Sequence, residues 1–179
     1  MVTEASNAQA TSTCMPLSAV RKGDVVWAGG KAANLGEMIN AGIPVPDGYV
    51  VATCAYRAFM EEHGLDEMVN ELLSSVDINN SAELASKASE IRNLITSKNL
   101  SHDLTSSILR MYTSLSKGPV AVRSSATAED MDNASFAGQQ DTYLNIEGAV
   151  ELVRAVRDCW ASLFAARAIF YREEQGIEH

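Results

Sequence analysis

The stretch AVRSSATAEDMDNASFAGQQDTYLN, residues 121–145, is the most informative part of the chain for its fold. It begins as a strand and then loses all apolar periodicity, gathering hydroxyls, acids, one glycine and two glutamines into one connection. A long connection without a core pattern is usually either disordered or a functional loop. Strand-like AVR on one side and DTYLN on the other favour a functional loop between two strands.

Composition indicates a globular chain of about one domain, with room for two lobes. Its 179 residues are 46% hydrophobic and 21% charged, which is ordinary globular usage. The net charge of −9 argues against a nucleic-acid-binding protein, because such domains are typically basic. Binding of a small anion stays open, since it needs only local positive charge.

The cysteines and the N-terminus indicate a cytoplasmic protein with no membrane segment. Cys14, Cys54 and Cys159 have no metal-ligand or redox spacing, so we interpret them as reduced thiols. The first 15 residues are small and polar, unlike a signal peptide, and predict a flexible leader before an ordered region at 16–179. No apolar run approaches the length of a membrane span.

Hydrophobic periodicity predicts an α+β protein with a helical block between strands. GGKAANLGEMINAG, residues 29–42, predicts a glycine loop and a short helix whose inner face is Leu35, Met38 and Ile39. Further predicted elements are a strand at about 48–52; four helices in a block at about 53–117, namely about 54–63, 65–74, 81–97 and 102–116; strands in PVAVRS and DTYLNI; and one long helix at about 148–173, with the stripe Val150, Val153, Val156, Trp160, Leu163 and Phe164.

Gly29-Gly30-Lys31, at the start of a predicted helix, is the first candidate site. Helix N-termini present free N–H groups and partial positive charge, so a lysine beside glycines suits a phosphate. The spacing matches neither a Walker A loop nor a dinucleotide fingerprint. A glycine-rich turn with a solvated lysine is the alternative interpretation.

Arg123, at the end of a predicted strand, is the second candidate. Its planar fork of donors on a rigid base suits bidentate phosphate binding, and the alternative is a salt bridge to Glu129 or Asp130. Thr127 and Asp130 have the spacing of a capping box for one helical turn.

FAGQQDT, residues 136–142, is the third candidate. Gly138 lets the backbone curl into an anion-binding nest, and Thr142 offers a hydroxyl donor. The alternative for this segment is a β-bulge. The three histidines, His63, His102 and His179, stand apart without metal or acid–base partners, so we predict no metal site and no catalytic residue.

Three blocks taken in order carry a resemblance to a known family. They are GGKAANLGEM with IPVPDGYVVAT, AVRSSATAED with SFAGQQDTYLNI, and CWASLFAARAIFYREEQG. The chain resembles the N-terminal ATP-binding domain of the phosphoenolpyruvate synthase and pyruvate phosphate dikinase family, which also includes rifampin phosphotransferases. The similarity covers about residue 17 to the end and is weakest across 64–117.

The resemblance implies an ATP-grasp-like fold, with a phosphate-loop region at about 119–146. It implies ATP or phosphate contacts at Lys31, Arg123, Gly138 and Thr142. In the family, phosphate passes from ATP to a histidine on a separate domain and then to pyruvate. Mg²⁺ is implied as a cofactor, bound by residues beyond this chain.

The resemblance also implies that this chain is the front part of that domain and is inactive alone. Pyruvate would be reached only through other domains, and the full-length enzyme could form homo-oligomers. Two alternatives remain open, namely the ATP-binding domain of a rifampin phosphotransferase and a stand-alone module that binds a nucleotide or a partner without catalysis.

Overall fold

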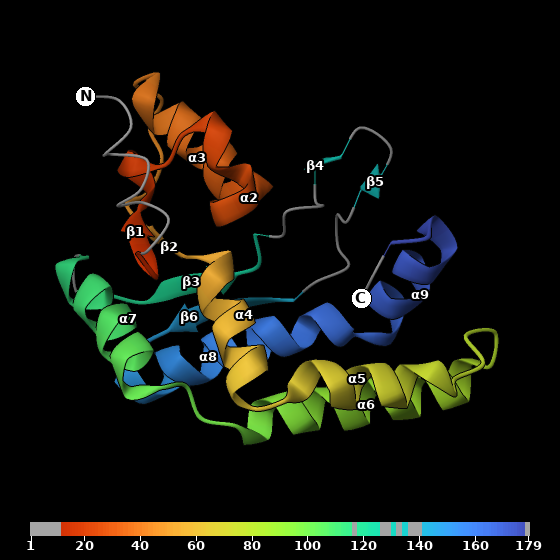
Figure 1. Ribbon diagram of the computed structural model, residues 1–179. Coiled ribbons are helices and arrows are strands. Elements are labelled where there is room, and N and C mark those ends of the chain that lie inside the picture. Colours follow the sequence, from red (N-terminus) through yellow and green to blue (C-terminus); the bar gives the residue numbers. More distant parts are fainter. Residues whose placement is uncertain (1–11, 116–117, 126–129, 132–133, 136–140, 178–179) are drawn as a thin grey trace. The chain divides into compact units, whose positions relative to one another are not determined.

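The computed structural model describes residues 12–115, 118–125, 130–131, 134–135 and 141–177, and the chain divides into two compact units (Figure 1). The first unit comprises Met1–Arg57, Ser101–Lys117 and Ser125–Met131. The second unit comprises Ala58–Leu100, Gly118–Ser124 and Asp132–His179.

The helices and strands give the α+β class predicted from the sequence. In the first unit they are β1 (Cys14–Pro16), η1 (Leu17–Ala19), η2 (Lys22–Asp24), α2 (Val25–Ala28), α3 (Gly30–Asn40), β2 (Tyr49–Val51), α7 (His102–Ser114) and the short β4 (Asp130–Met131). In the second unit they are α5 (Leu65–Ser74), α6 (Ser81–Ser97), β3 (Val120–Arg123), β5 (Ala134–Ser135), β6 (Thr142–Ile146), α8 (Ala149–Ala161), η3 (Ser162–Phe164) and α9 (Ala166–Gln175). Helix α4 (Thr53–Glu62) contains the boundary between the units.

The four helices predicted between 53 and 117 are confirmed as α4, α5, α6 and α7. Local signals explain their starts: the Asn80 side chain accepts a hydrogen bond from Glu83 N at 3.2 Å, and Ser101 Oγ accepts one from Leu104 N at 3.3 Å. Such N-caps satisfy donors that a helix start leaves unpaired. The four helices do not all share one unit, because α7 belongs to the first unit and α5 and α6 belong to the second.

The first unit is built on the antiparallel pair β1–β2, in which Cys14 lies opposite Val51 and Met15 opposite Val50. The predicted flexible leader, residues 1–15, is therefore wrong for Cys14 and Met15. Ala52 N also donates to Thr13 O at 2.9 Å, which continues the pairing by one more hydrogen bond. The extended chain before Pro16 thus serves as a strand partner.

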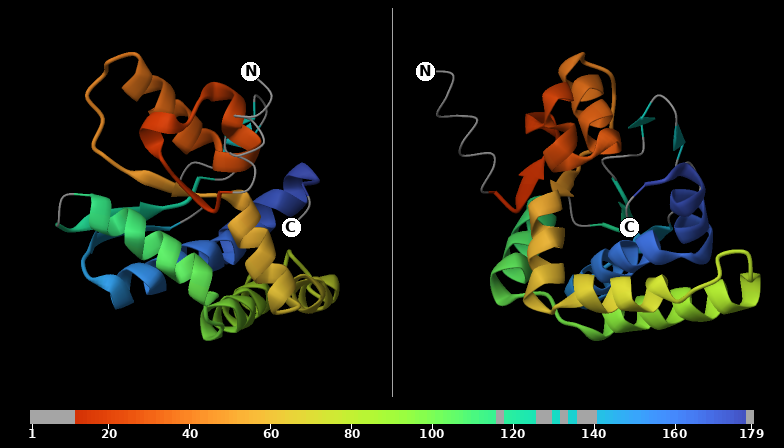
Figure 2. Two further views of the ribbon diagram at one scale, coloured as in Figure 1. Left: turned by 60° about the vertical axis from the view of Figure 1, so that its left-hand side comes forward. Right: turned by 45° about the vertical axis from the view of Figure 1, so that its right-hand side comes forward.

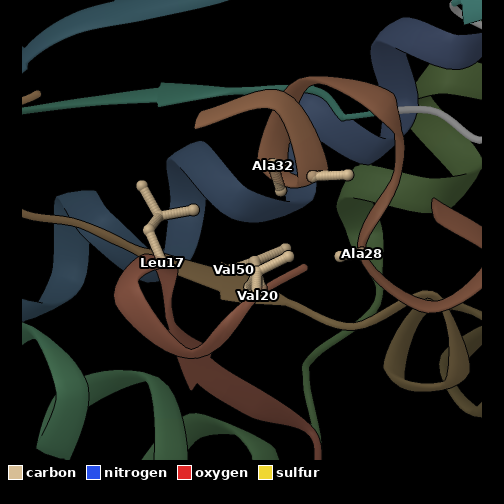
Figure 3. Close-up of a cluster of buried hydrophobic side chains, with 6 residues drawn as sticks. Leu17, Val20, Ala28, Ala32 and Val50 are labelled. Atoms are coloured by element: carbon tan, nitrogen blue, oxygen red, sulfur yellow. The ribbon is translucent and has the colours of Figure 1, made fainter. Parts of the chain in front are cut away.

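Helix α3 packs on η1 through small residues, and the buried cluster that contains Ala32 and Val20 also includes Val50 of β2 (Figure 3). The predicted inner face is wrong for Met38, whose exposed fraction is 38%, while Leu35 and Ile39 are half-buried. The buried positions are instead Gly30, Ala32, Ala33 and Gly36. A Cβ on Gly36 would lie 2.9 Å from the Val20 carbonyl carbon and 3.1 Å from Leu17 O, so the backbones approach too closely for a side chain.

The second unit has a helical layer and a two-stranded sheet. Helices α5 and α6 form an antiparallel hairpin, and α6 packs against α8 (Figures 1 and 2). Helix α8 covers the antiparallel pair β3–β6 on one face. The packed helices hold this sheet, and with it the candidate residues that end β3 and begin β6.

The prediction of a single helix at about 148–173 is wrong, because the α-helix is interrupted between α8 and α9. Ser162 begins the short η3, its hydroxyl donates to Cys159 O at 2.7 Å, and Ala165 is extended at φ −63° and ψ 143°. A serine hydroxyl bonded back to the preceding turn competes with regular helix geometry. Val150, placed in the predicted apolar stripe, is 79% exposed, and the buried face of α8 is Leu152, Ala155, Val156, Cys159 and Ala161.

Among the residues that the structure describes, no helix is both long enough and apolar enough to cross a membrane.

Candidate functional site

The β3–β6 ladder brings two predicted phosphate contacts together. Arg123, the last residue of β3, lies directly opposite Thr142, the first residue of β6. Directly opposed residues of an antiparallel pair point to the same face, with Cβ atoms about 4.5–5.5 Å apart. The register therefore places the side chains of Arg123 and Thr142 on the same face of this sheet, as neighbours at their Cβ atoms.

That face is turned away from α8. The neighbouring pair, Val122 and Tyr143, is half-buried, and Tyr143 Oη donates to the Asp158 carbonyl of α8 at 3.2 Å. Because side chains alternate along a strand, Arg123 and Thr142 lie on the opposite face, and both are exposed. Burial, reinforced by the neighbouring Asp141 and Asp158, raises the pKa of Tyr143, so its hydroxyl remains a donor.

A β-bulge lies in β6, next to this pair. Val120 pairs with Ile146 and Val122 with Tyr143, so β6 has one residue more than β3 between the two pairings. Asn145 takes a φ of 57°, a left-handed conformation that asparagine tolerates better than most residues. A β-bulge was the alternative interpretation for residues 136–142. The observed one lies beyond that segment, and 136–140 are outside the described residues.

Asp141, which lies in the third candidate segment but was given no role there, anchors the start of β6. Its carboxylate contacts Arg167 Nη2 of α9 at 2.5 Å and Arg92 Nη2 of α6 at 3.4 Å. Its N–H donates to Ser162 Oγ at 3.2 Å. These partners are 21 to 49 positions away in sequence, so no local spacing pattern predicts the contacts.

In the first unit, Lys31 is the second residue of α3 and is half-buried, which agrees with its predicted place at a helix N-terminus. The glycine before this helix has a structural reason. Gly29 has a φ of 79°, and a Cβ there would overlap the Ser125 carbonyl and lie 2.6 Å from Ser125 Oγ. The close approach that glycine permits is therefore made by the Ser125 backbone.

Ser125 also takes up one donor of the helix start. Its Oγ accepts a hydrogen bond from Ala32 N at 2.9 Å, as an N-cap side chain would. Ser125 was missed in the sequence, where it is one of several hydroxyls in the polar stretch. Its partner lies 93 positions away, beyond the reach of any local pattern.

Several predicted residues lie outside the described residues, namely Gly138, Thr127 and Glu129. Asp130 begins strand β4, so the helical turn predicted from the Thr127–Asp130 spacing is wrong at that residue.

The described residues contain no group of three or more His, Cys, Asp or Glu side chains that could hold a metal ion. The two described histidines have other contacts. His63 Nε2 lies 3.0 Å from Asn99 O, and its ring lies edge-on to Phe59 with the ring centroids 5.0 Å apart. His102 is exposed beside Asp103.

The model of one protein family, described as the pyruvate phosphate dikinase AMP/ATP-binding domain, matches residues 25–179. The chain belongs to this family. The resemblance inferred from the three sequence blocks is thereby confirmed, and the matched range contains all four predicted contact positions, Lys31, Arg123, Gly138 and Thr142.

Similar family members are named as phosphoenolpyruvate synthases. The chain is 51% identical over 164 residues to a probable phosphoenolpyruvate synthase of Methanothermobacter thermautotrophicus, an alignment that covers 88% of this chain and 24% of that protein. It is 51% identical over 162 residues to a probable phosphoenolpyruvate synthase of Methanocaldococcus jannaschii, covering 87% and 14% of the two chains. It is 43% identical over 164 residues to the phosphoenolpyruvate synthase of Pseudomonas aeruginosa, covering 87% and 21%. The chain thus spans about a quarter or less of the length of these relatives.

Proposed function

We propose that this chain is the ATP-binding portion of a phosphoenolpyruvate synthase. The whole enzyme would use ATP and water to convert pyruvate to phosphoenolpyruvate, giving AMP and phosphate through a phosphohistidine on a separate domain. One observation carries the assignment to this chain: Arg123 and Thr142 lie opposite each other on an exposed face, within a match to an AMP/ATP-binding domain. The names of the relatives favour the synthase.

Two donors on one rigid sheet suit the oxygens of a phosphate chain. A guanidinium offers several N–H donors in a fixed plane, and a threonine hydroxyl adds one donor beside them. Phosphoryl transfer depends chiefly on positioning and on neutralising charge, and preorganised donors supply both. Arg123 and Thr142 would bind and orient phosphate oxygens, and we propose the same for Lys31 and for the backbone at Gly138.

The remaining parts of the reaction would lie elsewhere in the enzyme. We propose an ATP-grasp-like fold for the complete domain, of which residues 16–179 are the front part. Mg²⁺ would be bound by residues outside this chain, and pyruvate would be reached through other domains. ATP supplies the transferred phosphoryl group, and the chain alone would bind it without turnover.

A titration of this chain with ATP, followed by backbone amide NMR with and without Mg²⁺, tests the proposal. We expect shifts at Lys31, Arg123 and Thr142 that saturate with added ATP. A folded chain with no shifts at millimolar ATP would contradict ATP binding by this portion.

Arg123→Ala provides the sharper test. Hydrogen bonds to charged groups contribute about 1.5–3 kcal/mol, so ATP affinity should fall by about 10- to 100-fold. Lys31→Arg keeps a positive charge and should weaken binding less. Arg154→Ala is the matched control, since it removes an arginine from the same unit whose side chain is 64% exposed on α8. Equal ATP affinities for Arg123→Ala and Arg154→Ala would refute the assignment.

A further inference from the structure

We propose that Asp141 is a positioning residue, which holds the first residue of β6 so that Thr142 stays beside Arg123. This inference rests on the proposed function, because it concerns how well these two residues bind ATP. Asp141 itself would not contact ATP in this proposal. It would act through Thr142, its neighbour in the chain.

Three contacts from three elements converge on this one residue. Asp141 Oδ1 lies 2.5 Å from Arg167 Nη2 of α9, and Oδ2 lies 3.4 Å from Arg92 Nη2 of α6. The two carboxylate oxygens thus have different arginine partners on different helices. The backbone N–H of Asp141 donates to Ser162 Oγ of η3, so both its side chain and its main chain are tied.

The Ser162 contact has a defined direction. Ser162 is fully buried, and its hydroxyl donates to Cys159 O at 2.7 Å while it accepts from Asp141 N at 3.2 Å. Because the hydroxyl proton is committed to Cys159, the oxygen lone pairs face Asp141. The break between α8 and α9, where Ser162 lies, therefore provides the acceptor that fixes the main chain at the start of β6.

The ion pairs of Asp141 with Arg92 and Arg167 serve to position β6 more than to stabilise the fold. The side chain of Asp141 is 31% exposed, and those of Arg92 and Arg167 are 41% and 51% exposed. Ion pairs this exposed stabilise a fold little, although a network on a rigid framework has a defined geometry.

Electrostatics and positioning predict opposite effects of removing the charge at Asp141. Taking a negative charge away from the neighbourhood of a bound polyanion should strengthen binding. Loss of positioning should weaken it. Asp141→Asn keeps the size of the side chain and removes the charge, so the direction of the change in ATP affinity distinguishes the two.

Asp158→Asn is the matched control. The Asp158 carboxylate lies in the same unit and pairs with Arg154 Nε at 3.7 Å within α8, with 27% of its side chain exposed. The Asp158–Arg154 ion pair lies within α8, and the hydrogen bond that Asp158 shares with β6 is made by its main-chain carbonyl, which accepts from Tyr143 Oη. The two variants therefore change the net charge equally.

The experiment is an ATP titration of the full chain by amide NMR for the wild type and both variants. We expect Asp141→Asn to weaken ATP binding about 5-fold, the size of an ordinary coupling between neighbouring residues. Asp158→Asn should bind as the wild type does or slightly tighter. Asp141→Glu, which keeps the charge for the two arginines, should recover part of the loss.

A Thr142→Val background separates positioning from general damage. If Asp141 acts through Thr142, Asp141→Asn should cause no further loss of affinity once the hydroxyl is absent. An equal loss in both backgrounds, or an Asp141→Asn chain that binds ATP as tightly as Asp158→Asn, would overturn the inference while leaving ATP binding intact.

Failure of the proposed function gives a different experimental result from failure of the inference about Asp141. A wild-type chain without ATP-dependent shifts contradicts the proposed function. The positioning of β6 is then judged without ATP, from the cross-strand nuclear Overhauser contact between Arg123 and Thr142. Weakening of that contact in Asp141→Asn but not in Asp158→Asn supports the positioning role of Asp141, and an unchanged contact overturns it.

Discussion

Replacing Gly29 with alanine should destabilise the first unit strongly, because two independent costs meet at this position. Gly29 caps α3 with φ 79° and ψ 163°, a conformation that only glycine adopts readily. It also lies against Ser125, so that an added Cβ would overlap the Ser125 carbonyl and lie 2.6 Å from Oγ. Neither the backbone conformation nor a neighbouring carbonyl can adjust cheaply.

The size of the effect follows from the two costs. A residue forced into a glycine-only region costs about 1–3 kcal/mol. Inserting a methyl group into a closely packed place costs about 1–3 kcal/mol more. We expect Gly29→Ala to lower the free energy of unfolding of the first unit by about 4 kcal/mol, which is large against ordinary stabilities of about 5–15 kcal/mol.

Gly42→Ala provides a comparison at a positive φ without the packing cost. Gly42 has almost the same φ, 76°, but nothing lies within 4 Å of a Cβ built on it. Its substitution should therefore cost only the backbone strain, about 1–2 kcal/mol. A larger loss at Gly29 then reflects the close approach of Ser125 together with the ψ of 163°, which only glycine adopts readily.

Urea unfolding followed by tryptophan fluorescence is the assay. A Trp160→Phe background leaves Trp27, two residues before Gly29 and half-buried, as the reporter of the first unit. The amide resonance of Ala32 shows whether its hydrogen bond to Ser125 survives. If Gly29→Ala lost no more stability than Gly42→Ala, the close approach of Ser125 would be irrelevant and the reasoning refuted.

Two further outcomes follow from the first unit. Ser125→Ala removes the acceptor of the Ala32 N–H and should cost about 1 kcal/mol, as loss of an N-cap does, whereas an unchanged urea midpoint would show that this hydrogen bond is unimportant. Burial raises the pKa of the Cys14 thiol from 9.0 to about 11, so its contribution to stability is complete below pH 9 and is lost as the pH rises towards 11. Alkylation of Cys14 by iodoacetamide, followed by peptide mass spectrometry, should accordingly reach half its maximal rate near pH 11, and a midpoint near pH 9 would contradict burial of the thiol.

Local sequence was sufficient for most of the secondary structure. Helices α5 and α6 span the ranges predicted for them, and the Asn80 cap begins α6. The strand that ends at Arg123 and the strand that contains Thr142 were also predicted. These features depend on residues within a few positions of one another, where periodicity, caps and breakers act directly.

The local rules failed where packing between distant residues decided the outcome. The apolar periodicity of 148–173 continues through Ser162, but the α-helix is interrupted there. The Ser162 hydroxyl donates to Cys159 O and accepts a hydrogen bond from Asp141 N. Helix α3 buries Gly36 and leaves Met38 partly exposed, because two backbone carbonyls approach it too closely for larger side chains.

The same distinction between local signals and distant packing applies to the candidate site. Sequence named Arg123, Thr142 and Lys31 from their chemistry, but it could not show that Arg123 and Thr142 lie opposite each other in one ladder. It gave no reason to select Ser125 or Asp141, whose partners lie 93 and up to 49 positions away. Residue chemistry and local secondary structure can be inferred from short stretches of the chain. Strand register and the contacts of Ser125 and Asp141 arise only when distant segments pack, because their energy depends on neighbours that the chain brings together on folding.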